Sequence, residues 1–316
     1  MLRRKRQTQK QHETSLPLQN DHATIYKTSR FTSTRYIAHL IFVICFILIF
    51  GTIYSDITAR DPCKVLSEET KPTPSTIPKL YHYQSKHDIL TPETKSWNTV
   101  LNISIKMTYP NITPSSEWRG VYWSDESCHN LVHDHYPDFI ATYDGFKHVI
   151  QRVDACRYLI LKKYGGVYAD TDISLHMKDI INLIPDDVGV VESPYRYNEN
   201  VQNSLMTSPK DHVFWDVAME IMVERGGSDA ILSTTGPKML DDAMKRYKGD
   251  VHVLPCELFQ RLPLGQLDTT FLNVLGREVL SRAIPMKGCG RYGDGICEVT
   301  RHSGKASWTK ESGKIA

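Results

Sequence analysis

The stretch YGGVYADTD, Tyr164–Asp172, contains two glycines, a short run with β propensity and two aspartates separated by one residue. The glycines predict the end of a helix, and the residues after them predict a short strand. Asp170 and Asp172 therefore follow a strand directly. Two interpretations of this pair stay open: an ordinary turn, in which Gly, Asp and Thr are common, or a divalent-metal site that holds a nucleotide.

Helix-like and strand-like patterns alternate on both sides of this stretch. Apolar residues at helical spacing predict a helix over residues 148–165, and similar patterns predict helices over 211–226 and 236–247. Runs rich in β-branched and aromatic residues predict strands at 78–84, 120–124, 166–170, 188–193 and 251–255. This alternation predicts an α/β domain with a mainly parallel, Rossmann-like sheet covered by helices.

The predicted elements place the acidic residues where a ligand or a metal could bind. Asp170 and Asp172 lie just past the carboxyl end of a strand, where open α/β sheets bind ligands, and in an extended segment both would project to the same side. Such oxygen ligands suit Mg²⁺ or Mn²⁺. Asp154 and Arg157 are three residues apart on the preceding helix and share a face, so they could grip a sugar or a phosphate. The alternative for that pair is an ordinary ion pair on a helix surface.

The amino-terminal part of the chain predicts a membrane anchor. Residues 1–35 form a basic tail with eight Lys or Arg against two acidic residues, and residues 36–55 form an uncharged, mostly aliphatic run. Twenty residues of helix match the hydrocarbon core, and the preceding positive charge predicts a cytosolic amino terminus. A cleaved signal peptide is the alternative. Residues 56–76, rich in proline, read as a stem, and residues 77–316 as the lumenal domain.

Two further features fit a lumenal domain. Asn102 and Asn111 begin glycosylation tripeptides, and six of the seven cysteines follow the apolar run. Cys289 and Cys297 are close in sequence and are the expected disulfide, although sequence does not fix the pairing. Since the basic charge is confined to the tail, no nucleic-acid partner is expected.

The run QRVDACRYLILKKYGGVYADTD, residues 151–172, resembles the signature of the glycosyltransferases of family 32, the sugar-binding region that contains the Asp-x-Asp motif. Residues 77–84, 203–215 and 233–240 are also similar to that family, so the resemblance covers most of residues 77–308. The resemblance implies a GT-A fold, a nucleotide-sugar donor, Mn²⁺ or Mg²⁺ as the cofactor, and transfer with retention at the anomeric carbon.

The resemblance also implies roles for single residues. Asp172 would be a direct metal ligand, and Asp170 would contact the ribose and the metal, partly through water. Asp154 and Arg157 would hold hydroxyls of the donor sugar. Because both aspartates would be committed to metal and nucleotide, the expected mechanism is a front-face displacement with the leaving phosphate oxygen as base.

Near the carboxyl end, RHSGKASW offers His302 as a further metal ligand, with Ser307 and Trp308 beside the pyrophosphate. A solvated loop histidine is the alternative for His302. Residues with a predicted acceptor-side or supporting role are Glu192, Asn203 and Asp268.

Residues 136–158 look most like the branch that transfers mannose from GDP-mannose to inositol phosphorylceramide. The expected protein is therefore a Golgi type II membrane mannosyltransferase that acts on a glycolipid or glycan acceptor. A membrane partner subunit stays open. The alternatives are a transferase that uses UDP-galactose or UDP-N-acetylglucosamine, and an inactive, membrane-tethered sugar-binding protein of the same fold.

Overall fold

The computed structural model describes residues 35–46, 64–65, 76–87, 90–103, 118–176, 183, 186–194, 200–260 and 299–303. The chain divides into two compact units, Met1–Ile49 and Phe50–Ala316. The first unit contains a helix over residues 35–46, which is the described part of the predicted membrane span. Within the described ranges, no helix is both long enough and apolar enough to cross a membrane.

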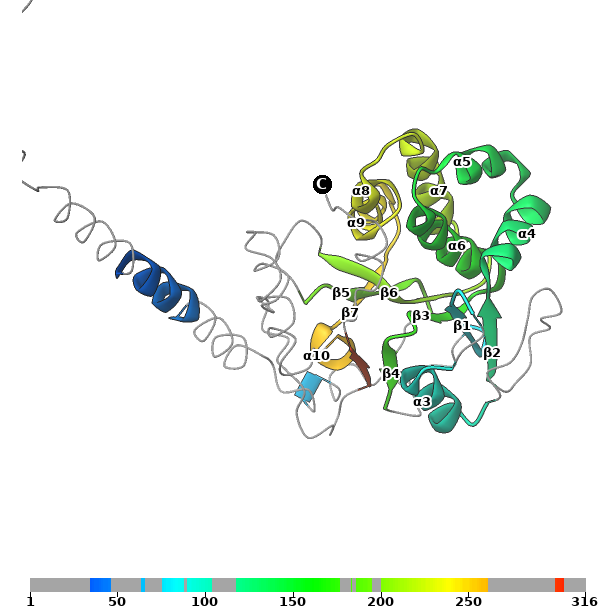
Figure 1. The fold of residues 1–316 in the computed structure, drawn as a ribbon. Helices are drawn as coiled ribbons and strands as arrows, with labels where there is room; N and C mark the ends of the chain where they lie inside the picture. Colours follow the sequence, from blue (N-terminus) through cyan, green and yellow to red (C-terminus); the bar gives the residue numbers. More distant parts are fainter. Residues whose placement is uncertain are drawn as a thin grey trace, which may run out of the picture. The chain divides into compact units, whose positions relative to one another are not determined.

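A six-stranded sheet with the order β2-β1-β3-β6-β5-β7 organises the second unit (Figure 1). Its strands are β1 (Leu80–Gln84), β2 (Arg119–Trp123), β3 (Gly166–Ala169), β5 (Gly189–Glu192), β6 (Val201–Ser208) and β7 (His252–Leu254). Neighbouring strands are parallel except at β6, which is antiparallel to both β3 and β5. The predicted mainly parallel sheet is therefore confirmed with one exception: β6, which the sequence patterns missed, runs antiparallel to the two strands beside it.

Helices pack on both faces of this sheet. One apolar cluster joins it to α4 (Asp125–His135), α6 (Val149–Tyr164), α7 (Phe214–Arg225) and α9 (Pro237–Arg246). A second cluster joins the other face to α3 (Pro92–Leu101) and α10 (Cys256–Phe259). The remaining elements are η1 (Pro137–Phe139), α5 (Ile140–Gly145), α8 (Ile231–Thr234), and a two-stranded sheet of β4 (Ile173–Leu175) and β8 (Thr300–His302). The α/β architecture predicted from the sequence is therefore confirmed.

The α6–β3 junction explains the two glycines of the opening stretch. Gly165 and Gly166 have φ of +66° and +98°, a region that side chains rarely adopt. A Cβ on Gly166 would lie 2.6 Å from the Leu80 carbonyl oxygen. His82 on β1 contacts the Gly165 carbonyl oxygen through Nε2 at 2.9 Å, and Trp123 donates to its Nδ1 at 3.1 Å. Glycine is therefore required where α6 turns closely past β1.

A disulfide between Cys128 on α4 and Cys156 on α6 ties these two helices together. Cys256 is also disulfide-bonded, while Cys45 is a free, exposed cysteine. The sequence did not predict the Cys128–Cys156 bond, since 28 positions separate the two residues. Cys289 and Cys297, the expected pair, lie outside the described residues.

The segment predicted as a stem contributes to the second apolar cluster. Val65 lies within residues 56–76 and is 2% exposed there, packed in the same cluster as Ile77. Apolar contact with the domain therefore begins before residue 77. Of the predicted glycosylation sites, Asn102 is exposed and caps the end of α3, and Asn111 lies outside the described residues.

Candidate active site

The Asp-x-Asp pair occupies a tight turn between β3 and β4. Asp170 follows the last residue of β3, and its amide donates to the Ser204 carbonyl oxygen at 2.8 Å. The Ile173 amide then donates back to the Asp170 carbonyl oxygen at 2.9 Å, which closes the turn. The segment is therefore a turn rather than an extended stretch. Asp170 contacts Arg157 and Tyr168, and Asp172 lies beside His302.

Arg157 on α6 is the centre of the first group of partners. Its side chain is 5% exposed, and Nη1 donates to Asp170 Oδ1 at 3.0 Å and to the Asn203 carbonyl oxygen at 2.9 Å. Nη2 lies 3.2 Å from Asp154 Oδ1. The guanidinium carbon is 4.9 Å from the ring centre of Tyr168, whose hydroxyl also donates to Asp170. One planar cation therefore connects the helix aspartate with the first aspartate of the turn.

Asp154 is buried within a network of hydrogen bonds. Asn203 Nδ2 donates to its Oδ1 at 3.0 Å, and the Thr235 hydroxyl donates to Oδ2 at 3.3 Å. Asn203 also donates to the Tyr158 hydroxyl. Burial raises the pKa of Asp154 to about 6, against the opposing effect of Arg157 and of these hydrogen bonds. The carboxylate thus retains its charge near neutral pH only because its polar partners surround it.

His302 reaches the second aspartate through the small sheet. β4 and β8 pair antiparallel with Ile173 opposite His302, and His302 Nε2 lies 3.3 Å from Asp172 Oδ2. His302 Nδ1 contacts Gln260 Oε1 at 2.9 Å, and the Gln260 amide donates to the Ser204 hydroxyl. Burial opposes protonation of the imidazole, but Asp172 and Asp170 raise the pKa of His302. The predicted closeness of His302 and the Asp-x-Asp pair is therefore seen in the fold.

The donor set fits a divalent cation such as Mn²⁺ or Mg²⁺. Asp172 offers carboxylate oxygens, and a His302 tautomer that donates from Nδ1 to Gln260 leaves the Nε2 lone pair beside Asp172. Among the described residues, one group of three candidate ligands has all its ligand atoms within 4.8 Å of one another, and it includes none of Asp170, Asp172 and His302. Asp172 and His302 would hold the metal directly, because His302 Nε2 lies 3.3 Å from Asp172 Oδ2. Asp170, which accepts from Arg157 and Tyr168, would contact the metal through water.

That group of three is Glu192, Cys256 and Glu257, at the ends of β5 and β7. Because Cys256 is disulfide-bonded, its sulfur does not serve as a thiolate ligand. Glu192 accepts a long hydrogen bond of 3.4 Å from the Cys256 amide. The group is therefore not a second metal centre.

The surroundings of Arg157 also suit an oxygen atom of a bound donor. The Nε of Arg157 is buried and has no hydrogen-bond partner in the described part of the chain. A buried N–H without an acceptor is costly, so a hydroxyl or phosphate oxygen bound beside Arg157 would satisfy it. Asp154 and Arg157 are both buried, at 6% and 4% exposed, and Asp154 contacts the guanidinium at 3.2 Å.

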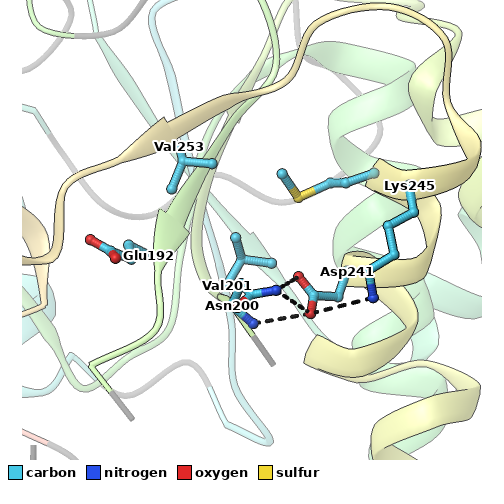
Figure 2. Close-up of a pocket in the computed structure, with 7 residues that line it drawn as sticks. Glu192, Asn200, Val201, Asp241, Lys245 and Val253 are labelled. Atoms are coloured by element: carbon cyan, nitrogen blue, oxygen red, sulfur yellow. Dashed lines mark hydrogen bonds and ion pairs between the residues drawn. The ribbon is translucent and has the colours of Figure 1, made fainter. Parts of the chain in front are cut away.

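The other predicted site residues lie in different parts of the structure or outside its described residues. Asn203, predicted to have an acceptor-side or supporting role, donates to Asp154 and Tyr158, which fits the supporting role. Glu192 is half-buried at the end of β5 and lines a separate pocket between β5, β7 and α9 (Figure 2). Asp268, Ser307 and Trp308 lie outside the described residues.

Four partners of the site were not predicted from the sequence: Tyr158, Tyr168, Thr235 and Gln260. Tyr168 lies inside the opening stretch, two residues before Asp170, and this spacing along a strand was the sequence feature that could have predicted their contact. Thr235 and Gln260 are distant in sequence from the residues they contact, so no local pattern indicates their role.

Residues 97–189 match a family model described as "Glycosyltransferase sugar-binding region containing DXD motif". The matched segment includes α6, β3 and the Asp-x-Asp turn. The resemblance seen in the sequence is therefore confirmed over residues 97–189, which match this sugar-binding region.

The chain is also similar to yeast proteins of known name. Mannosyl phosphorylinositol ceramide synthase SUR1 of Saccharomyces cerevisiae is 28% identical over 205 residues, which cover 62% of this chain and 50% of that protein. Inositol phosphoceramide mannosyltransferase 3 of Schizosaccharomyces pombe is 34% identical over 99 residues, 31% of this chain and 25% of that protein. The chain spans about half the length or less of these curated relatives.

Among solved structures, one titled PaToxG Glycosyltransferase aligns with 77% of this chain and 98% of its own chain. Its sequence identity to this chain is 16% and its TM-score is 0.37.

Proposed function

Because the chain carries a glycosyltransferase sugar-binding region with the Asp-x-Asp motif, we propose that it is a retaining, metal-dependent hexosyltransferase of GT-A type. The favoured reaction moves mannose from GDP-mannose to an inositol phosphorylceramide-like glycolipid. The observation that carries this proposal is the convergence of Asp154, Arg157 and Asp170 with the Asp172–His302 pair at the end of β3.

The site residues have separate tasks in this reaction. Asp172 and His302 would hold Mn²⁺, which supplies neutralisation of the charge that grows on the leaving diphosphate. Arg157 binds a donor oxygen through Nε while its other nitrogens stay fixed by Asp154 and Asp170. The charge of these two aspartates outweighs the effect of burial and raises the pKa of Arg157, so the guanidinium remains charged.

Retention is what the resemblance to family 32 implies, and the engagement of the site carboxylates favours a front-face route over a covalent glycosyl intermediate. Asp170 is engaged by Arg157 and Tyr168, Asp172 lies against His302, and both oxygens of Asp154 accept hydrogen bonds from the protein. None of the three is positioned as a nucleophile toward the anomeric carbon. The acceptor hydroxyl therefore attacks from the face that the diphosphate leaves, and its proton passes to the departing phosphate oxygen.

The choice of mannose and of a ceramide-linked acceptor rests on the relatives from Schizosaccharomyces pombe, which are named inositol phosphoceramide mannosyltransferases. UDP-galactose and UDP-N-acetylglucosamine are the competing donors, since the Asp-x-Asp turn itself does not select a sugar. A glycan is the competing acceptor.

We also propose that residues 36–55 anchor the chain as a type II protein with its catalytic unit in the Golgi lumen. The Cys128–Cys156 disulfide supports this placement, because such bonds persist in oxidising compartments. Protease protection of residues 77–316 in sealed microsomes tests it. Digestion of that unit without detergent would refute the lumenal orientation.

Nucleotide release by the full-length chain in detergent tests the activity. Each of GDP-mannose, UDP-galactose and UDP-N-acetylglucosamine is supplied with Mn²⁺ or with EDTA. We expect release from GDP-mannose that EDTA abolishes, and a loss of at least about a hundredfold in Asp172→Asn. Glu220→Gln, an exposed carboxylate on α7, is the matched control. Binding of a sugar nucleotide without release would instead indicate the inactive sugar-binding protein.

A further inference from the structure

The short strand β4 follows the Asp-x-Asp turn directly and lies between β8 on one edge and α3 on the other (Figure 1). β4 and β8 pair antiparallel, with Ile173 opposite His302. Next to this pair, the Ser303 amide donates to the Asp172 carbonyl oxygen at 2.8 Å. In an antiparallel pair, alternate residues turn their backbone groups away from the partner strand. One edge of β4 therefore holds Asp172 beside His302, and the other edge presents its backbone groups to α3.

Two side chains at the start and in the middle of α3 bind carbonyl groups of that second edge. The Thr91 hydroxyl donates to the Thr171 carbonyl oxygen at 2.8 Å, and the Trp97 indole nitrogen donates to the Ile173 carbonyl oxygen at 2.9 Å. Thr91 is also the N-cap of α3, because its hydroxyl accepts from the Thr94 amide at 3.1 Å. The same side chain thus joins the first turn of α3 to the Asp-x-Asp turn.

Ser96 contacts the far end of this edge. The Leu175 amide donates to the Ser96 hydroxyl at 2.8 Å, and this hydroxyl donates in turn to the Glu93 carbonyl oxygen within α3. α3 and its N-cap therefore contact a backbone group of every second residue from 171 to 175. A two-stranded sheet is marginally stable by itself. The side chains of α3 take the place of a third strand and fix β4.

Trp97 also connects β4 to the main sheet. Its side chain is 0% exposed, and its ring stacks on Tyr81 of β1 with ring centres 4.2 Å apart and an interplanar angle of 10°. Tyr81 pairs with Val167 on β3, the strand that leads into the Asp-x-Asp turn. The indole is therefore held by the main sheet on one side and holds the backbone of Ile173, the neighbour of Asp172, on the other.

We propose that α3 positions the metal site, with the Thr91 hydroxyl and the Trp97 indole N–H keeping Asp172 in place beside His302. His302 Nε2 lies 3.3 Å from Asp172 Oδ2, and metal–ligand distances tolerate displacements of only about 0.2 Å. Thr91 and Trp97 act through the backbone of the turn, so they are positioning residues. The inference rests on the proposed function, because the metal belongs to that reaction.

The test measures Mn²⁺ binding rather than turnover. The full-length chain in detergent is titrated with Mn²⁺ in the presence of GDP or, in a parallel arm, UDP, and electron paramagnetic resonance reports free Mn²⁺. Trp97→Phe removes the indole N–H and keeps an aromatic ring. Trp123→Phe is the matched control, because Trp123 is also 0% exposed and donates its indole N–H to His82 Nδ1 at 3.1 Å, in the cluster on the other face of the sheet.

A second pair of variants keeps the test decisive if Trp97→Phe does not fold. Thr91→Val removes the hydroxyl and keeps the shape of the side chain, whereas Thr91→Ser keeps the hydroxyl. Ser124→Ala controls for the loss of a helix cap, because the Ser124 hydroxyl caps α4 by accepting from the Ser127 amide at 3.1 Å. Circular dichroism and the melting temperature report on folding.

We expect the Kd for Mn²⁺ to rise about tenfold in Trp97→Phe and in Thr91→Val, because groups that orient metal ligands affect affinity on this scale. Thr91→Ser, Trp123→Phe and Ser124→Ala should bind Mn²⁺ as the parent does, even where the melting temperature falls. Parental affinity in the folded Trp97→Phe and Thr91→Val variants would overturn the inference. An equal loss of affinity in the two controls would also overturn it. A parental chain that binds no Mn²⁺ with either nucleotide would instead refute the metal-dependent function.

Discussion

Asp154→Asn should make the free energy of unfolding fall less as the pH rises. Asp154 has its pKa raised from 3.8 to about 6 by burial. A raised pKa in the folded state means that the native protein binds the proton more tightly than the unfolded chain. The stabilisation from that proton is fully present below pH 3.8 and is lost as pH rises through 6. The shift of about two pKa units corresponds to about 3 kcal/mol in the free energy of unfolding.

Asparagine suits this site because it preserves the shape of the network. Its carbonyl oxygen can accept from Asn203, and its amide can donate to the Thr235 hydroxyl, which now serves as acceptor. The variant has no proton to lose there. The difference in unfolding free energy, Asp154→Asn minus parent, should therefore rise by about 2.5 kcal/mol between pH 4 and pH 7.

Urea unfolding of the full-length chain, followed by tryptophan fluorescence at several pH values, measures this difference. The contributions of other titrating groups to the free energy of unfolding cancel when the two proteins are compared at the same pH. Asp138→Asn replaces an exposed carboxylate and should give a difference that is flat to about 0.5 kcal/mol. A flat curve for Asp154→Asn as well would refute the conclusion that burial dominates the energetics of this carboxylate.

Three further outcomes follow from the fold. Burial lowers the pKa of His82 from 6.5 to about 4, so its contribution to stability is full above pH 6.5 and is lost as pH falls through 4. His82→Gln should remove about 3 kcal/mol of this acid sensitivity in urea unfolding; an unchanged acid slope would contradict it. Replacing Cys128 and Cys156 by alanine should lower the free energy of unfolding by about 3–4 kcal/mol, because the bond spans 28 residues; equal stability of parent and variant under non-reducing conditions would disprove this. Gly166→Ala should cost at least about 1–3 kcal/mol at φ +98°, whereas Gly227→Ala, with open space around it, should be tolerated; similar melting temperatures for both would argue against the close packing of the junction.

Local patterns were sufficient to predict the elements that carry the site. A helix that ends at a glycine pair, a short strand and an acidic turn all depend on neighbouring residues, so α6, β3 and the position of Asp170 follow from the sequence. The Asp154–Arg157 contact is also local, since residues three apart share a helix face. For the same reason the family resemblance was visible in one continuous stretch, residues 151–172.

Contacts between distant segments were decided only by the tertiary structure. β6 enters the sheet antiparallel between β3 and β5, and this placement brings Asn203 to Asp154 on α6. Pairing of β4 with β8 places His302 beside Asp172, although about 130 positions separate them. The pocket between Glu192 and α9 likewise needs three strands and a helix to exist. The sequence by itself determined which groups the site uses, because residue type and local spacing set their chemistry. The tertiary structure decided which of them meet, because strand order and direction set the distances between segments far apart in the chain.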